Sequence, residues 1–249
     1  MSTISNLVGS DVAFTVEVLR LANSAIFALR HQVVSVQHAV SVLGTHRLRG
    51  LVLTVGLRDF FRSARHDELV RRCWRHNLAT ALVSEWLADV YRLGRDSAYT
   101  AGLLHDVGRL ALLTMYPGRY LHVLQLHRKT SRPIVECERE TLGRDHREMN
   151  PILARQWRLP VSLTQSTCSQ ESENPEQGDR DFTDLIAASC AAAVELGYRL
   201  ADSNHTPRLD TLRAKVPGDV WEQVKDSLPD LEESTGRKIS TFESEFLRI

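Results

Sequence analysis

The sequence predicts an all-α protein, and three observations lead to this class. Apolar residues recur at helical spacing along most of the 249-residue chain. No two alternating apolar runs are joined by an Asn-Gly or Asp-Gly turn, which would indicate a β-hairpin. Residues typical of helix ends follow the periodic segments, as Gly44, Gly94 and Gly143 do. We therefore expect a bundle of helices.

The charge balance excludes a global attraction to nucleic acid or to anionic membranes. Lys plus Arg and Asp plus Glu number 31 each, so the formal net charge is zero. Two groups of arginines stand at helical spacing and are interpreted as solvated helix faces: Arg58, Arg62 and Arg65, and Arg71, Arg72 and Arg75. We expect no nucleic-acid partner.

The cysteines and the N-terminal segment bear on the cellular compartment. The four cysteines include no C-x-x-C pair, which argues against a disulfide framework and against a zinc ribbon. The N-terminus lacks the basic and apolar regions of a signal peptide. No apolar run approaches the roughly 18 residues of a membrane span. We predict a cytoplasmic protein with no membrane association.

The first half of the chain contains a series of predicted helices. Ser35 is a suitable N-cap for a short helix that ends at Gly44, where helices often use a left-handed residue. A long helix is expected from about Asp67 to Leu93, with Gly94 as its end. Its apolar residues cover more than one face, which is typical of a helix at the centre of a bundle.

The most apolar segment, residues 98–116, follows Asp96 or Ser97 as a helix start and ends before Pro117. Pro133 suits the first turn of the next helix.

The following residues complete the predicted bundle. Asp145 followed by Glu148 indicates a capping box that opens another helix. Residues 169–181 are polar and acidic, as in a loop, and residues 182–196 return to helical spacing.

The predicted domain organisation is one large domain with an appendage. We expect a domain over residues 1–200, with an N-terminal helical part over about 1–65 and a core over about 66–200. After a linker-like break, residues 201–249 are expected to form a short helical C-terminal extension.

His105-Asp106, within the segment GLLHDVG, is the strongest candidate for chemistry. An imidazole and a carboxylate in an apolar stretch cost free energy unless they are paired or bind a metal. His76, on the predicted long helix, and His146, at the start of the capped helix, could complete a metal site. The alternative is that these side chains only hydrogen-bond to their surroundings.

Five segments occur in an order that resembles the HDOD family, a divergent and signalling-associated branch of the HD-domain superfamily of metal-dependent phosphohydrolases. They are VLRLANSAIF, VQHAVSVLG, WRHNLATALV, AYTAGLLHDVGRLAL and DHREMNPILARQWRLP. The resemblance covers about residues 1–200 and implies an HD-like helical bundle.

The resemblance implies four candidate metal ligands in this chain. His76 matches the histidine of the first core helix of the superfamily. His105 and Asp106 match the pair that gives the superfamily its name, and His146 matches the histidine that opens the next helix of metal-binding relatives.

Several positions depart from the pattern that the resemblance implies. Ser169 and Gln170 stand in the region where many relatives have a paired histidine, and Asn150-Pro151 replaces a pair of small residues. Cys190 stands in the Ala-rich helix where the superfamily places its last aspartate. Losing that carboxylate weakens the hold on a divalent ion, and a thiolate there favours softer metals such as zinc.

We therefore expect a degenerate site that holds no cofactor or a single divalent ion of iron, manganese or zinc, and that does not support two-metal catalysis. This favours a non-catalytic regulatory or adaptor module of bacterial signal transduction, with signalling proteins as partners in trans. One alternative is a residual phosphohydrolase whose metal acts on a nucleotide or cyclic dinucleotide. The other is a sensor that binds a nucleotide or small molecule without turnover.

Overall fold

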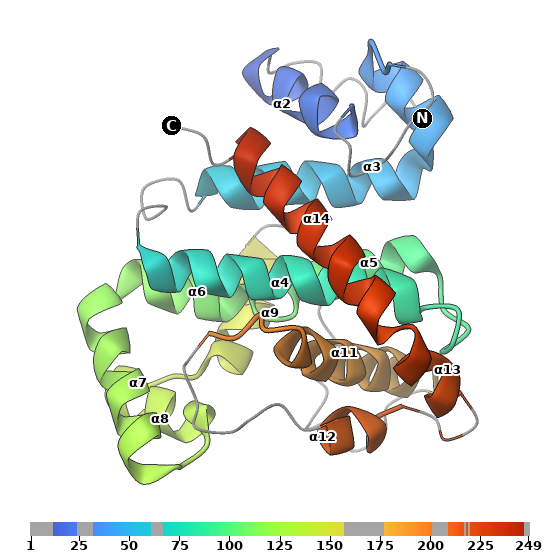
Figure 1. Ribbon diagram of the computed structural model, residues 1–249. Coiled ribbons are helices and arrows are strands. Elements are labelled where there is room, and N and C mark those ends of the chain that lie inside the picture. Colours follow the sequence, from blue (N-terminus) through green and yellow to red (C-terminus); the bar gives the residue numbers. More distant parts are fainter. Residues whose placement is uncertain are drawn as a thin grey trace. The chain divides into compact units, whose positions relative to one another are not determined.

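Every regular element is a helix in the residues that the computed structural model describes, which are 12–23, 32–60, 67–156, 177–200, 209–216, 218 and 220–246 (Figure 1). The helices are α2 (Val12–Ala22), α3 (Val36–Phe60), α4 (Glu68–Leu87), α5 (Arg95–Leu104), α6 (Val107–Met115), α7 (Pro117–Thr130), α8 (Ile134–Leu142), α9 (His146–Gln156), α11 (Gln177–Glu195), α12 (Leu209–Arg213), α13 (Trp221–Asp226) and α14 (Leu228–Phe246). The all-α class is confirmed. Over the same residues, no helix is both long enough and apolar enough to cross a membrane.

The chain forms two compact units, one of residues 1–63 and 232–249 and the other of residues 64–231. In the first unit, α2 packs against α3. The backbone of α3 is broken at Gly44, whose φ is 80°, so two helical segments meet at the glycine that the sequence predicted to be left-handed. Beyond the end of α2, the Asn23 amide accepts from the Val33 N–H at 2.6 Å and donates to the Val33 carbonyl at 2.7 Å.

Helix α4 is the central helix of the second unit. The Asp67 carboxylate caps it by accepting from the Leu69 N–H at 2.8 Å. Helices α5, α6 and α11 all pack against α4, which explains why its buried residues lie on more than one face.

The predicted end of this helix was wrong. Helix α4 ends at Leu87, where the chain enters a turn in which Arg92 has a φ of 55°. Gly94 is the N-cap of α5 and not the end of α4. The apolar residues between Leu87 and Gly94 extended the helical pattern, but tertiary packing of α5 on α4 requires the chain to reverse there.

A turn at His105-Asp106 divides the most apolar segment into α5 and α6. A Cβ at Gly102 would lie 2.7 Å from the Ala81 Cα, so only glycine lets α5 approach α4 this closely. A Cβ at Gly108 would lie 2.2 Å from the His146 carbonyl oxygen, so only glycine lets α6 approach α9 this closely. The two glycines therefore hold the His-Asp turn between α4 and α9.

Three sequence signals define the ends of α7, α8 and α9. Pro117 is the first residue of α7, and Gly143 follows α8 with a φ of 79°. The Asp145 side chain accepts from the Glu148 N–H at 3.0 Å at the start of α9. The predicted end of the apolar segment before Pro117, the end at Gly143 and the start at Asp145 are confirmed, whereas α7 is a helix that the sequence did not predict.

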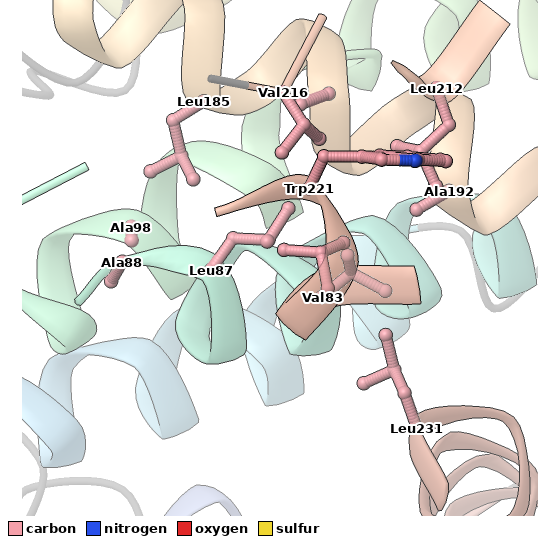
Figure 2. Close-up of a cluster of buried hydrophobic side chains, with 12 residues drawn as sticks. Val83, Leu87, Ala88, Ala98, Leu185, Ala192, Leu212, Val216, Trp221 and Leu231 are labelled. Carbon is pink, nitrogen blue, oxygen red and sulfur yellow. The ribbon is translucent and has the colours of Figure 1, made fainter. Parts of the chain in front are cut away.

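Residues 209–231 belong to the second unit. Helices α12 and α13 place Leu212 and Trp221 in an apolar cluster with Val83 of α4 and Leu185 of α11 (Figure 2). The first part of the predicted C-terminal extension therefore packs against the helical core. The last helix, α14, is longer than the short helices that the sequence predicted after residue 200.

We predict that Gly102→Ala destabilises the protein by about 1–3 kcal/mol, because the added methyl group must separate α5 from the backbone of α4. Urea unfolding followed by circular dichroism measures the loss. The matched control is Gly118→Ala in α7, where no atom lies within 4 Å of the added Cβ and the helix favours alanine. Equal stability of the two variants would contradict the close contact.

Candidate functional site

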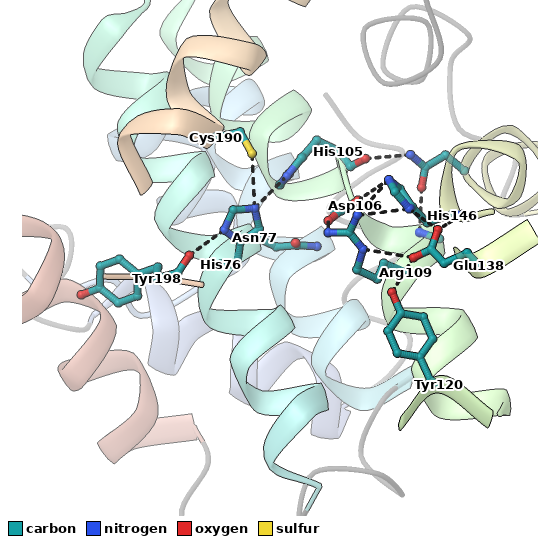
Figure 3. A network of polar contacts seen from close by, with 12 residues as sticks. His76, Asn77, His105, Asp106, Arg109, Tyr120, Glu138, His146, Cys190 and Tyr198 are labelled. Atoms are coloured by element: carbon teal, nitrogen blue, oxygen red, sulfur yellow. Dashed lines mark hydrogen bonds and ion pairs between the residues drawn. The ribbon is translucent and has the colours of Figure 1, made fainter. Parts of the chain in front are cut away.

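The His-Asp turn supplies residues to two groups of polar side chains that lie on different sides of it (Figure 3). His105 and Asp106 come from the turn between α5 and α6, His76 from α4, His146 from α9 and Cys190 from α11. His105 joins His76 and Cys190, whereas Asp106 joins His146. Of the described residues, only His76, His105 and Cys190 form a group of three metal-ligating atoms within 4.8 Å of one another.

The histidine–cysteine cluster consists of His76, His105 and Cys190. The two Nε2 atoms lie 3.3 Å apart, and the Cys190 Sγ lies 3.5 Å from the His76 Nε2. Each imidazole uses its other nitrogen for a backbone carbonyl: His76 Nδ1 lies 2.8 Å from the Tyr198 oxygen and His105 Nδ1 lies 2.7 Å from the Gly102 oxygen. Both rings are therefore fixed in orientation.

The cluster favours charge on both the thiol and one imidazole. Burial raises the pKa of Cys190, but the neighbouring His76 and His105 outweigh burial and lower it to about 5. Burial lowers the pKa of His76, but the Cys190 thiolate outweighs this and raises it. The two shifts have one cause, which is the attraction between a thiolate and an imidazolium.

The Asp106 network consists of Asp106, Arg109, Tyr120, Glu138 and His146. Arg109 forms an ion pair with Asp106, one turn away on the same stretch of chain, and its Nε lies 3.5 Å from a Glu138 oxygen. The Arg109 Nη2 also lies 3.1 Å from the His146 ring nitrogens. The Arg109 side chain is only 13% exposed, so this guanidinium is an internal cation.

Glu138 of α8 is fully buried and anchors the other side of the network. It accepts from the Tyr120 hydroxyl, from the His146 backbone N–H at 3.0 Å and from the His146 Nδ1 at 2.6 Å. Burial raises the pKa of Glu138, but His146 and Arg109 outweigh it and lower that pKa. Both carboxylates of the network are therefore ionised, since Arg109 holds the Asp106 pKa well below its usual range against the effect of burial.

Asn150 of α9 fixes the backbone of the turn. Its side-chain nitrogen donates to the His105 carbonyl at 2.7 Å, and its oxygen accepts from the Gly108 N–H at 2.7 Å. One amide thus satisfies backbone groups on both sides of Asp106. Asn150 departs from the small residue implied by the family resemblance, and the structure gives it this role.

Sequence reasoning identified the histidines and Asp106 but missed the groups that bind them. Arg109 lies three residues after Asp106, a spacing typical of an ion pair on one helix, so its pairing had a signal in the sequence. No local sequence signal indicated the contacts of Glu138, Tyr120 and Asn150, because their partners are distant in the chain. Cys190, predicted as a lost ligand, lies against His76. Ser169 and Gln170 lie outside the described residues.

A helical bundle with a His-Asp turn between its core helices has the architecture of HD-like proteins. Residues 1–173 match the family model of the HDOD domain. This protein therefore belongs to the HDOD family.

One curated relative, an uncharacterized protein of Treponema pallidum (strain Nichols), is 27% identical over 165 residues, which are 64% of this chain and 31% of the relative. The matched part therefore spans about a third of the relative's length.

Three solved structures share the fold. An HDOD domain protein with unknown function from Geobacter sulfurreducens has a TM-score of 0.70 at 20% identity, covering 98% of this chain and 86% of that one. A protein named "Putative phosphohydrolase" from Shewanella amazonensis SB2B has a TM-score of 0.71 at 21% identity, covering 96% and 87%. A "Putative signal transduction protein" from Marinobacter aquaeolei VT8 has a TM-score of 0.72 at 21% identity, covering 98% and 55%. Similarity at these identities shows the fold alone.

We predict that Arg109→Met destabilises the protein by roughly 3–5 kcal/mol, because it leaves the buried Asp106 and Glu138 carboxylates without their cation. The matched control is Arg132→Met, which removes exposed pairs with Glu136 and Glu140 and should leave the stability almost unchanged. Urea unfolding at neutral pH compares the two. Similar small losses would show that the internal ion pair contributes little.

A second prediction concerns the pH dependence that Glu138 contributes. Its pKa is lowered by folding, so the unfolded chain binds the proton first as the pH falls. The stabilisation is fully present above about pH 5 and declines as the pH falls below the unfolded pKa of about 4.3. Wild type should therefore lose its stability advantage over Glu138→Gln on acidification, measured by urea midpoints between neutral and acidic pH. An advantage that grew on acidification would contradict this sign.

Proposed function

We propose that this HDOD protein is a non-catalytic regulatory or adaptor module of bacterial signal transduction, in which the HD site does not support hydrolysis. The observation that carries the proposal is the pairing of Arg109 with Asp106 inside the protein. In a metal-dependent hydrolase, the carboxylate of the His-Asp pair helps to hold the ion that activates water. In this chain an internal guanidinium neutralises that carboxylate.

The donor atoms also fit a two-metal centre poorly. Such a centre holds two ions about 3.5–4 Å apart and needs ligands for both. The three donors that gather in the described part of the chain are two imidazoles and one thiol, with no carboxylate among them. His146 is engaged by Glu138 and Arg109 on the other side of the turn. We therefore derive no hydrolytic step through a metal pair.

The same interpretation extends to the partners of the protein. The fold occurs both in a neighbour named for signal transduction and in one named for phosphohydrolysis, so the state of the site has to discriminate between the two roles. The Arg109 pairing favours the first. We propose signalling proteins in trans as the partners.

The proposal predicts no metal-dependent turnover by the full chain. Nucleotides and cyclic dinucleotides are incubated with the protein and manganese, iron or magnesium, and the products are separated by chromatography. Wild type, Asp106→Ala and the exposed control Asp226→Ala should all show only background hydrolysis. Metal-dependent turnover by wild type that Asp106→Ala abolishes and Asp226→Ala retains would overturn the non-catalytic function and establish the residual phosphohydrolase.

A further inference from the structure

We propose that His76, His105 and Cys190 bind a single zinc-class metal ion that ties α4, the end of α5 and α11 together. This site excludes Asp106 and His146, and it goes beyond the regulatory function proposed above. It can hold a metal whether or not the protein has any hydrolytic activity.

The two imidazoles are oriented as they would be around a metal ion. A carbonyl oxygen only accepts, so the contacts of His76 Nδ1 with Tyr198 and of His105 Nδ1 with Gly102 place the ring protons on Nδ1. The two Nε2 atoms face each other across 3.3 Å beside the Cys190 sulfur, so they repel unless a cation, either a proton on His76 or a metal ion, lies among them. Metal-ligating histidines have this arrangement, with the outer N–H donated to a carbonyl.

The distances between the donor atoms also suit one zinc ion. Zinc binds imidazole nitrogen at about 2.0–2.1 Å and thiolate sulfur at about 2.3 Å in tetrahedral geometry. Two nitrogens on one such ion are therefore about 3.3–3.4 Å apart, and a nitrogen and a sulfur about 3.5–3.6 Å apart. The protein has 3.3 Å between the two Nε2 atoms and 3.5 Å between the Cys190 Sγ and the His76 Nε2. The third pair, His105 and Cys190, lies within 4.8 Å, so a small side-chain movement closes the triangle.

The chemical types of the donor atoms and their access to solvent favour zinc as well. Imidazole and thiolate select zinc over magnesium, calcium or manganese, which prefer oxygen ligands. His76 is buried, whereas His105 and Cys190 are partly exposed, so the site has both a fixed inner ligand and a route from solvent.

The geometry also indicates what the ion would do. Three protein ligands leave one position of a tetrahedral ion for water or a small ligand. The ligands come from α4, the turn after α5 and α11, which pack on one another in the second unit. An ion at this point would therefore stabilise the contact among these three elements and respond to chelation.

The experiment uses the full chain, purified without chelator. Elemental analysis should find close to one zinc ion per chain, and removal by a chelator should lower the melting temperature, with zinc restoring it. Cobalt substituted for zinc should show a thiolate-to-cobalt charge-transfer band in the near ultraviolet. Cys190→Ser and His105→Gln should each lose most of the bound metal, and Cys190→Ser should also lose the band. The controls Cys137→Ala in α8 and His122→Gln in α7 should retain both.

The wild-type measurements keep the proposal falsifiable if a cluster variant fails to fold, because they need no substitution. No bound zinc, no cobalt band and a melting temperature unchanged by zinc or chelator would overturn it. Equal metal loss in the control variants would also overturn it, because the metal would then lie elsewhere. Neither result depends on hydrolysis, so this proposal and the regulatory function fail separately.

Discussion

The internal charge of Arg109 is the interaction on which the centre of this protein depends. Two carboxylates, Asp106 and Glu138, are almost completely removed from water in the second unit. An ionised carboxylate in such a place costs several kcal/mol unless an opposite charge and hydrogen bonds compensate it. The guanidinium of Arg109 contacts both carboxylates, and its planar fork of donors suits this arrangement. This pairing fixes the positions of the turn, of α8 and of the first residue of α9.

The His-Asp turn serves two sites because neighbouring side chains near a helix end point in different directions. His105 faces α4 and α11, and Asp106 faces α8 and α9. The Asn150 amide fixes the backbone of the turn, and Gly102 and Gly108 allow the close helix contacts on either side of it. His105 and Asp106 therefore keep their separate directions. In this arrangement, the carboxylate is neutralised by the protein itself, while the imidazole is left beside a second imidazole and a thiol. The proposed regulatory function rests on the Asp106 side of the turn, and the proposed metal site rests on the His105 side.

The sequence alone determined the helical class, because the period of apolar residues depends only on local order along the chain. It also determined several helix ends, since Asp67, Pro117 and Gly143 act through their own backbone or the next few residues. The resemblance to the HDOD family singled out His76, His105, Asp106 and His146 as candidate metal ligands, and that role stays a prediction. None of this required knowledge of distant contacts.

Only the tertiary structure decided which of these residues meet. Glu138 and Asp106 are far apart in the chain, and no local pattern relates them, yet both bind Arg109. Cys190 is distant in sequence from His76 but lies 3.5 Å from its Nε2. Helix α4 ended earlier than its apolar pattern indicated, because the packing of α5 overrode that pattern. The physical reason is common to all three cases: a side chain's environment is set by neighbouring helices, whereas the sequence specifies only the helices themselves.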